Sequence, residues 1–413
     1  MLESEFKALR TGIRSGLDVT SSYSDAELIA YIENYLRREQ ALSDLTAGEK
    51  RRLVRRMYDS FRGLDLLQPL VDDRSVTEIM INSHEEIFIE REGKVEQVAL
   101  AFESRDRLED IIQTIVAGVN RVVNESSPIV DARLKDGSRV NIVLPPVALK
   151  GPTMTIRKFP EKPMTMQELV EREALSGEAA EFLKKLVASK YNIFVSGGTG
   201  SGKTTFLNAL SQYIPSDERV ITIEDSAELQ IVTVPNLVSL ETRNTNTEGR
   251  GEITVRDLIR SSLRMRPNRI VVGEVRGREA LDMLQAMNTG HDGSLSTGHS
   301  NSTKDMVSRL ETMVLSGADL PIQVVRQQIS SAIDIFVHLA RLRDRSRRVM
   351  EISEVTGLSQ GEVIIQPLYV FEEAGEQEGR ICGRLRRTDQ QLQHTAKLRM
   401  AGYPEEEGGE RYC

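Results

Sequence analysis

The residues with the clearest chemistry lie at positions 197–205, where the sequence reads GGTGSGKTT. This segment fits the pattern G-x-x-x-x-G-K-[ST] and follows an apolar run, YNIFVS at 191–196, that predicts a strand. Glycines let successive backbone N–H groups face one anion, and the dipole of the following helix adds positive potential. We therefore predict a phosphate-binding loop for ATP, in which Lys203 reaches the β- and γ-phosphates and the Thr204 hydroxyl holds Mg²⁺. The predicted nucleotide-binding residues are Gly198, Thr199, Gly200, Ser201, Gly202, Lys203, Thr204 and Thr205.

Two further apolar runs end in acids, which phosphoryl transfer needs for metal binding and for orienting water. The run RIVVGE at 269–274 predicts a strand with Glu274 at its carboxyl end, close to the phosphate loop. The other run is VITIEDSAE at 220–228, whose three acids are Glu224, Asp225 and Glu228. We expect one of the three to orient the attacking water and the others to bind Mg²⁺ through its water shell. The predicted magnesium contacts are Thr204, Glu274 and Asp225. Alternatively, such acids are ordinary polar exits from strands.

His291 and His299 lie in a run of small polar residues at 289–302, TGHDGSLSTGHSNS, which has little capacity for packing. Such a loop indicates a functional surface, because ordering it costs entropy and buries little apolar area. Zinc binding is disfavoured because no third ligand at a matching spacing is evident. A hydrogen-bonding sensor of the γ-phosphate is the better interpretation.

Three arginines, Arg256, Arg260 and Arg264, recur every four residues on a helix that Thr254 is expected to cap. A solvated helix face is the usual explanation for such a stripe. The alternative is a set of arginine fingers that face the nucleotide of a neighbouring subunit. Arg243, in a polar loop, is a further candidate for that role.

Composition narrows the class of protein. A chain of 413 residues predicts two or three domains, and the apolar fraction of 39% supports folded ones. The net charge of −8 disfavours nucleic acid as a partner. Two cysteines form no disulfide framework, which favours a reducing compartment. No apolar run approaches the about 18 residues of a spanning helix, and the N-terminus resembles no signal peptide, so we expect a cytoplasmic protein.

The pattern of apolar residues predicts a modular α/β chain. We expect a loose arm over residues 1–23 and a helical module to residue 63, with capping boxes at Ser24 and Thr46. A mixed domain follows at 64–158, with a hairpin turn at Asp136-Gly137. After a linker at 159–166, residues 167–372 alternate helices with strands, which predicts a largely parallel sheet. The charged, glycine-rich segment 373–413 is expected to be a mobile tail.

Several motifs in order resemble the type II/type IV secretion ATPase superfamily, and in particular its CpaF/TadA branch, which serves tight-adherence (Tad/Flp) pili. They are the phosphate loop, ITIEDSAEL, LRMRPNRIVVGEVRGREALDMLQAMNTGHDGS and LSTGHSNS, preceded by SVTEIMIN, ESSPIVDARLKDGSRVNIVLPP and TIRKF. The resemblance covers residues 64–372. It implies a PAS-like α+β N-terminal domain, a linker and a RecA-like P-loop C-terminal domain, with nucleotide bound between the two domains.

The resemblance further implies a homohexameric ATPase at the cytoplasmic face of the inner membrane, working with a membrane platform protein. It assigns the acidic box to Glu224, Asp225 and Glu228, with Glu228 as the water-activating base. Glu274 is the Walker B acid. Because this position holds glutamate rather than the aspartate usual in P-loop proteins, the resemblance implies that it contacts the metal through water. His291 and His299 form the histidine box. Arg157 brings positive charge from the N-terminal domain, with Arg133 and Arg139 as weaker candidates.

Two other classes of protein remain open. A nucleic-acid or conjugation-type motor would also need the phosphate loop and the basic stripe. A scaffold that binds nucleotide without hydrolysing it would need only the loop, although the acids at 228 and 274 argue against that class.

Overall fold

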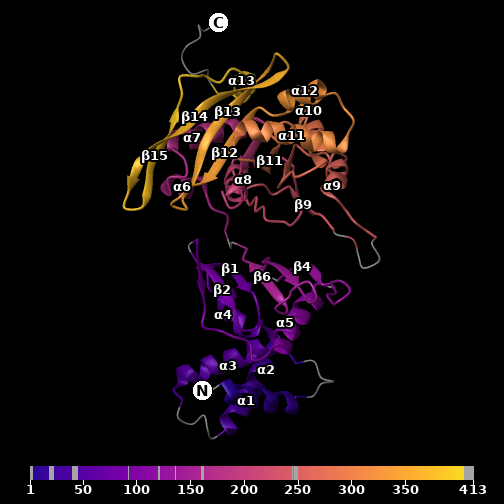
Figure 1. Ribbon diagram of the computed structural model, residues 1–413, viewed down its shortest axis with the longest axis vertical. Coiled ribbons are helices and arrows are strands. Elements are labelled where there is room, and N and C mark those ends of the chain that lie inside the picture. Colours follow the sequence, from indigo (N-terminus) through magenta and orange to yellow (C-terminus); the bar gives the residue numbers. More distant parts are fainter. Residues whose placement is uncertain are drawn as a thin grey trace. The chain divides into compact units, whose positions relative to one another are not determined.

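The computed structural model describes residues 3–17, 23–39, 45–91, 93–119, 121–134, 136–159, 162–243, 245 and 250–403. The chain divides into two compact units, Met1–Pro160 and Glu161–Cys413. Their division falls within the segment 159–166, where a linker was expected. Figure 1 shows the helices and strands of each unit.

The first unit begins with three helices, α1 (Glu3–Gly16), α2 (Asp25–Arg38) and α3 (Ala47–Arg62). Both predicted capping boxes are present: the Ser24 and Thr46 side chains each accept a backbone N–H, and their own backbone N–H groups donate to the carboxylates of Glu27 and Glu49. The expected loose arm is wrong for residues 3–16. Phe6 and Ile13, seven residues apart, lie on one face of α1 and are buried against the other two helices. The part of that arm at 18–22 lies outside the described residues.

The rest of the first unit is an antiparallel sheet with the strand order β3-β2-β1-β6-β5-β4. The strands are β1 (Val76–Ile81), β2 (Ile87–Arg91), β3 (Lys94–Gln97), β4 (Ile129–Arg133), β5 (Arg139–Val143) and β6 (Thr153–Arg157). The helical elements are η2 (Asp65–Leu67), α4 (Gln68–Asp72) and α5 (Arg105–Ala117). Leu108, Ile112 and Val116 of α5 are buried in the same cluster as alternate residues of β1. The predicted hairpin is confirmed, since β4 pairs with β5 and Gly137 has a φ of 90°.

The second unit is built on a nine-stranded sheet with the order β15-β14-β13-β12-β7-β11-β10-β8-β9. Its parallel part comprises β7 (Ile193–Gly197), β8 (Val220–Glu224), β9 (Leu237–Glu241), β10 (Arg269–Val272), β11 (Leu295–His299) and β12 (Ile335–Arg341). An antiparallel extension follows, made of β13 (Arg347–Ser359), β14 (Glu362–Gln377) and β15 (Arg380–Arg387). The predicted parallel core is therefore confirmed.

Helices cover both faces of this sheet (Figure 1). One group packs with Ile193 and Val195 of β7 and comprises α6 (Met166–Glu171), α7 (Gly177–Ala188) and α8 (Lys203–Ser211). The other packs with Phe194 and comprises α9 (Val255–Ser262), α10 (Glu279–Asn288), α11 (Thr303–Gly317) and α12 (Ile322–Ala332). Every residue of β7 is buried, as expected for a strand covered on both faces.

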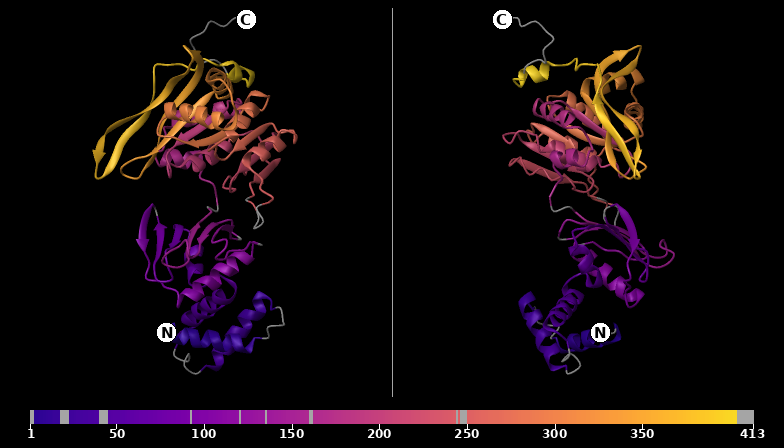
Figure 2. Two further views of the ribbon diagram at one scale, coloured as in Figure 1. Left: turned by 45° about the vertical axis from the view of Figure 1, so that its right-hand side comes forward. Right: turned by 90° about the vertical axis from the view of Figure 1, so that its left-hand side faces the viewer.

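The predicted mobile tail is wrong as far as residue 403. Strands β14 and β15 form a long hairpin, drawn in yellow in Figure 2, and helix α13 (Ala396–Met400) follows. A charge that suggested disorder is paired instead, because Glu373 lies 2.6 Å from Arg343 in the turn between β12 and β13. Ile381 and Leu385 of β15 are buried. Residues 404–413 lie outside the described residues.

Candidate nucleotide-binding site

The glycine-rich segment forms the turn between β7 and α8, in the middle of the sheet. Gly200 and Gly202 have φ values of 71° and 94°, in the left-handed region that favours glycine. At Gly197 a β-carbon would lie 2.4 Å from the carbonyl oxygen of Leu339 on β12, so no side chain fits there. Helix α8 begins at Lys203, and its amino end faces the turn. The backbone therefore has the conformation that the phosphate-loop prediction requires.

Lys203 is folded back onto this loop. Its Nζ donates to the carbonyl oxygens of Gly197 and Gly198, both at 3.1 Å. The side chain is 7% exposed, and burial lowers the pKa of the ammonium group. The buried hydroxyl of Ser201 has no hydrogen-bond partner within the described part of the chain. A buried cation and an unpartnered donor in one loop suit an anionic ligand.

His299 connects this lysine to Glu274. Lys203 Nζ lies 3.2 Å from His299 Nδ1, and His299 Nε2 lies 2.6 Å from Glu274 Oε1. Burial, with a smaller effect of Lys203, lowers the pKa of His299 against the opposing influence of Glu274. The imidazole is therefore neutral at pH 7. Because Nδ1 faces an ammonium group, Nε2 carries the proton; its approach to Glu274 Oε1 is a close polar contact whose angle is not that of a hydrogen bond.

Sheet topology brings these groups together. His299 ends β11 and is in register with Gly197 at the end of the adjacent, parallel β7. Glu274 follows β10, the next strand in the sheet. The Thr297 hydroxyl donates to the carbonyl oxygen of Gly273 at 2.7 Å, which ties the residue before Glu274 to β11. The site thus lies at the carboxyl ends of three neighbouring strands, where α/β proteins bind ligands.

Arg276 is a site residue that the sequence reasoning missed. Its Nε and Nη2 donate to Glu274 Oε2 at 2.9 and 2.6 Å, and its Nη1 lies 3.6 Å from Asp225 Oδ2. The arginine therefore lies between the acids that follow β10 and β8. The sequence could have pointed to Arg276, because it lies only two residues after Glu274, in the segment VRGRE.

The three acids after β8 have different environments. Glu224 is 4% exposed, and its Oε1 accepts the backbone N–H groups of Glu228 and Leu229 at 2.9 and 3.1 Å. Burial raises the pKa of Glu224 to about 7. Asp225 is exposed and Glu228 is half-buried. Glu224 is thus a positioning residue for the loop that carries Glu228.

A second overlooked residue, Asn208 on α8, holds the same loop. Its Nδ2 donates to the carbonyl oxygen of Glu228 at 3.2 Å, and its Oδ1 accepts from the backbone N–H of Gln230 at 2.7 Å. Asn208 is 5% exposed. The helix that starts at the phosphate loop therefore also positions the acidic loop. Nothing in the local sequence around Asn208 indicates this contact, which spans 20 residues.

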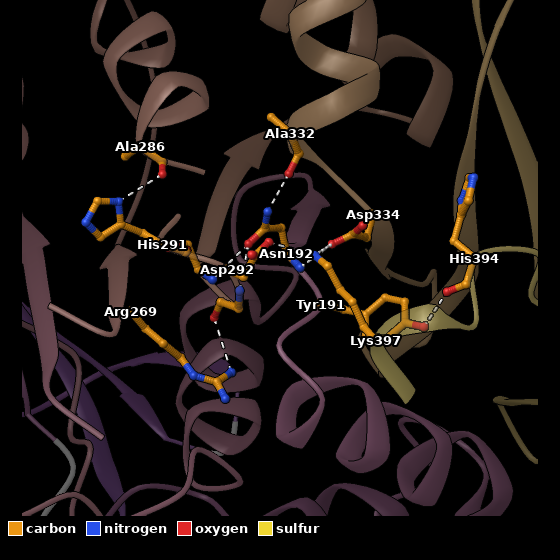
Figure 3. Close-up of polar contacts among 12 residues, drawn as sticks. Tyr191, Asn192, Arg269, Ala286, His291, Asp292, Ala332, Asp334, His394 and Lys397 are labelled. Carbon is orange, nitrogen blue, oxygen red and sulfur yellow. Dashed lines mark hydrogen bonds and ion pairs between the residues drawn. The ribbon is translucent and has the colours of Figure 1, made fainter. Parts of the chain in front are cut away.

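His291 does not join His299. His299 is the last residue of β11 and His291 lies four positions before its first residue, Leu295; a strand of five residues at about 3.3 Å each is roughly 15 Å long. His291 Nδ1 is 3.2 Å from the carbonyl oxygen of Ala286 (Figure 3). The two histidines of the predicted box therefore do not lie together within this chain, and a role of His291 toward nucleotide stays a prediction. The small polar residues of segment 289–302 suggested a loop, but five residues of this segment form strand β11.

Two of the three arginines in the predicted stripe form ion pairs within the chain. Arg256 and Arg260 each lie 2.8 Å from Asp282 of α10, a residue that is 5% exposed. Arg264 follows the end of α9 and is exposed. Arg243 donates from Nε to the carbonyl oxygen of Gly251 at 2.7 Å. It also lines a pocket of about 340 Å³ together with Asp225, Arg256 and Arg276.

Arg157 ends β6 in the first unit, where it is exposed and in register with Glu78 and Arg139 on the neighbouring strands. Arg133 pairs in register with Arg139 on the adjacent hairpin. The roles of these three arginines toward nucleotide stay predictions.

The phosphate loop, the acids at the strand ends and the two-sided parallel sheet define a nucleotide-binding protein of the P-loop α/β class. The family of the chain follows from comparison. The model of the family "Type II/IV secretion system protein" matches residues 61–389, and the chain belongs to this family. Within the described residues, no helix has the length and apolar character needed to cross a membrane.

Individual relatives agree with this assignment. The chain is 33% identical to a putative conjugal transfer protein of Mycobacterium tuberculosis (strain ATCC 25618 / H37Rv), over 77% of this chain and 91% of the relative. It is 34% identical to the type IV secretion system protein VirB11 of Brucella suis biovar 1, over 67% and 84%. The ATPase DotB of Legionella pneumophila, at 22% identity and a TM-score of 0.51, covers 70% of this chain and 79% of its own and supports the fold. The predicted fold class, α/β with an N-terminal and a C-terminal domain, is confirmed.

Proposed function

We propose that this protein hydrolyses ATP to ADP and phosphate and that hydrolysis drives a secretion or pilus-assembly machine. The observation that carries the proposal is the contact chain from Lys203 through His299 to Glu274. It joins the phosphate-binding cation to an acid at the carboxyl end of an adjacent strand. A group that senses the γ-phosphate must touch both the phosphate loop and the acids that act on water, and His299 does so.

Lys203 is expected to exchange its two backbone carbonyl contacts for oxygens of the β- and γ-phosphates. That exchange frees His299 Nδ1 and makes the imidazole available to a ligand. Both carbonyl contacts and the histidine contact are longer than 3 Å, and a charged phosphate oxygen is a stronger acceptor than either. Nucleotide binding and rearrangement of the histidine are thereby coupled through one ammonium group.

Mg²⁺ fits the residues present. Thr204, at the first turn of α8, would hold it, with Glu274 and Asp225 contacting it through water. The described residues contain no cluster of three or more His, Cys, Asp or Glu side chains that would bind a metal alone. That finding suits Mg²⁺, which protein sites usually bind with one or two carboxylates and the phosphates of the substrate. When bound, the ion neutralises charge on the phosphates.

We assign Glu228 as the general base that orients the attacking water. Its backbone is held on both sides, by Glu224 at its N–H and by Asn208 at its carbonyl. The side chain is half-buried, so water can reach it. Glu224, which is buried and bonded to backbone, is unsuited to that role and positions the loop instead.

The motor is proposed to be a homohexamer at the cytoplasmic face of the inner membrane, bound to a platform protein of the machine. In such a ring, Arg157 from the N-terminal domain and Arg243 would add positive charge to the nucleotide. The family membership supports a secretion role, and the motif resemblance favours Tad/Flp-type pilus assembly. A pull-down from cells that identifies an inner-membrane pilus platform protein would support this role. Recovery of a platform from a different machine would contradict the pilus assignment.

A conjugation-type motor is the second candidate. Relatives in Mycobacterium tuberculosis and Rhizobium radiobacter are named as conjugal transfer proteins, the latter 35% identical over 74% of this chain. The test is to delete the gene for this protein and measure pilus formation and DNA transfer separately. Loss of pili with intact DNA transfer favours the first candidate, and the reverse favours the second.

A further inference from the structure

We propose that Arg341 and Arg347, on the hairpin of β12 and β13, bind the part of the nucleotide that ATP and ADP share. This inference rests on the proposed function. The two residues form a cross-strand pair in register at the end of the hairpin nearest the phosphate loop. Neither belongs to the motifs that predicted the site, and both are exposed.

Both side chains lie over the phosphate loop. Arg347 Nε donates to the carbonyl oxygen of Gly200 at 2.9 Å. A β-carbon added at Gly202 would lie 3.3 Å from Cδ of Arg347, and one added at Gly200 would lie 3.8 Å from Nη1 of Arg341. A β-carbon at Gly202 would therefore crowd Arg347, whereas one at Gly200 would only reach van der Waals contact with Arg341. Two guanidinium groups are thus held beside a loop shaped to bind an anion.

The charge of Arg341 points to an anionic ligand. Like charges directly opposite each other on two antiparallel strands destabilise the sheet. Arg341 forms no ion pair or side-chain hydrogen bond within the part of the chain that the structure describes. Nearby acids are committed elsewhere. Asp344 accepts from Ser346 and from the backbone N–H of Ile381, and Glu373 binds Arg343.

The position of the pair in the sheet indicates which part of the nucleotide it meets. Strand β12 flanks β7 on one side, and β11 with His299 flanks it on the other. If the γ-phosphate lies toward His299 and Glu274, the α-phosphate and the nucleoside extend from the loop toward β12. Arg341 then pairs with an α- or β-phosphate oxygen. Arg347, whose Nε is held by the carbonyl oxygen of Gly200, would approach the same nucleotide through its guanidinium group.

The test is equilibrium binding of ADP and of ATP to the purified full-length protein, measured by displacement of a fluorescent ADP analogue. The variants are Arg341→Gln, Arg347→Gln and the double substitution. Arg343→Gln is the matched control, because it removes the same charge from the same hairpin but contacts Glu373 and Glu376. Because each charge-assisted bond contributes about tenfold or more, we expect the double variant to bind both nucleotides at least about tenfold more weakly. The control should bind as the wild type does.

Melting in the absence of nucleotide separates a ligand role from a structural one. Arg341→Gln should leave the nucleotide-free protein at least as stable as the wild type, since it relieves a repulsion, while reducing the stabilisation that ADP gives. A double variant with wild-type affinity, or one that loses affinity for ATP but not for ADP, overturns the inference alone. Wild-type protein that binds neither nucleotide overturns the proposed function and this inference with it.

Discussion

His299 Nε2 and Glu274 Oε1 lie 2.6 Å apart, and Lys203 approaches the other ring nitrogen of the same histidine. The imidazole thus joins the phosphate loop to the acid after β10 while carrying no charge of its own. A neutral ring in this position accepts from the lysine and turns its N–H side toward the carboxylate, whereas a protonated ring could not accept from the lysine.

Replacing His299 by glutamine keeps one donor and one acceptor but loses the rigid ring that places the two nitrogens toward Lys203 and Glu274. We expect kcat for ATP hydrolysis to fall about 100-fold through misplacement of the acid and the phosphate, with little change in ATP affinity. Steady-state kinetics and equilibrium ATP binding distinguish the two effects. His291→Gln is the matched control, because His291 lies four positions before the first residue of β11. Equal losses of kcat in both variants would contradict the placement of the two histidines.

The pKa of His299 also predicts a pH dependence. Burial lowers it from the ordinary value of 6.5, so the ring stays neutral until the pH falls below that of an ordinary histidine. Between the lowered folded pKa and 6.5 the unfolded state binds more protons, so this group makes stability fall as the pH falls. Turnover that depends on the neutral ring should decline over the same acidic range. An unchanged pH profile in His299→Gln would contradict this assignment.

The raised pKa of Glu224 predicts the opposite change of stability with pH. Its pKa is raised from 4.5 to about 7, so the stability from its neutral form is complete below pH 4.5 and is lost as the pH rises through 7. Glu224→Gln keeps an acceptor for the two backbone N–H groups and has no charge to bury. We expect its free energy of unfolding at pH 8 to exceed that of the wild type by on the order of 2 kcal/mol, and to match it near pH 4.5. Urea unfolding at the two pH values measures this. A variant that is less stable at pH 8 would show that the ionised form is the stabilised one.

Arg276 contacts Glu274 and lies near Asp225, and it gives a third prediction. Arg276→Ala should lower kcat about tenfold to 100-fold, because Glu274 loses two charge-assisted bonds that fix its position. Arg276→Lys should recover part of this loss, since it restores the charge but not the two-pronged contact. The KM for ATP should change little, since the phosphate loop is untouched. Full activity of Arg276→Ala would exclude a role at the site.

Local sequence was sufficient for the parts of the fold that local geometry determines. The phosphate loop, the Asp136-Gly137 hairpin and the capping boxes at Ser24 and Thr46 each depend on residues within one turn. Contacts between distant segments were not readable. Asn208 acts through the backbone of a loop 20 residues away, and the buried face of α1 is narrow, with Phe6 and Ile13 buried and Leu9 packed beside them.

The wrong prediction of a mobile tail at 373–413 also arose from contacts between distant segments. Lys397 on α13 donates to Asp292 at 2.9 Å and to Asp334 at 2.7 Å, residues more than 60 positions away (Figure 3). We expect Lys397→Ala to lower the free energy of unfolding by about 2 kcal/mol, because both carboxylates lose a half-buried partner. Met400→Ala on the same helix is the control, since Met400 is 81% exposed. Equal stability of the two variants would contradict the anchoring of α13.

Glu228→Gln tests the assignment of the base. The variant should retain ATP binding and lose most hydrolysis, because the amide cannot take a proton from water. Binding and turnover, measured on the same preparation, check this. Unchanged turnover would contradict the assignment and favour Glu274 for the role.

Phosphate release from ATP and Mg²⁺, measured for the wild type and for Lys203→Ala, tests the proposed ATPase activity most directly. Lys203 contacts both the phosphate loop and His299, so its removal affects both. We expect sustained turnover by the wild type and a loss of at least about 100-fold in the variant, with the fold intact by circular dichroism. A wild-type protein without turnover, or a Lys203→Ala variant with equal turnover, would contradict ATP hydrolysis at this site.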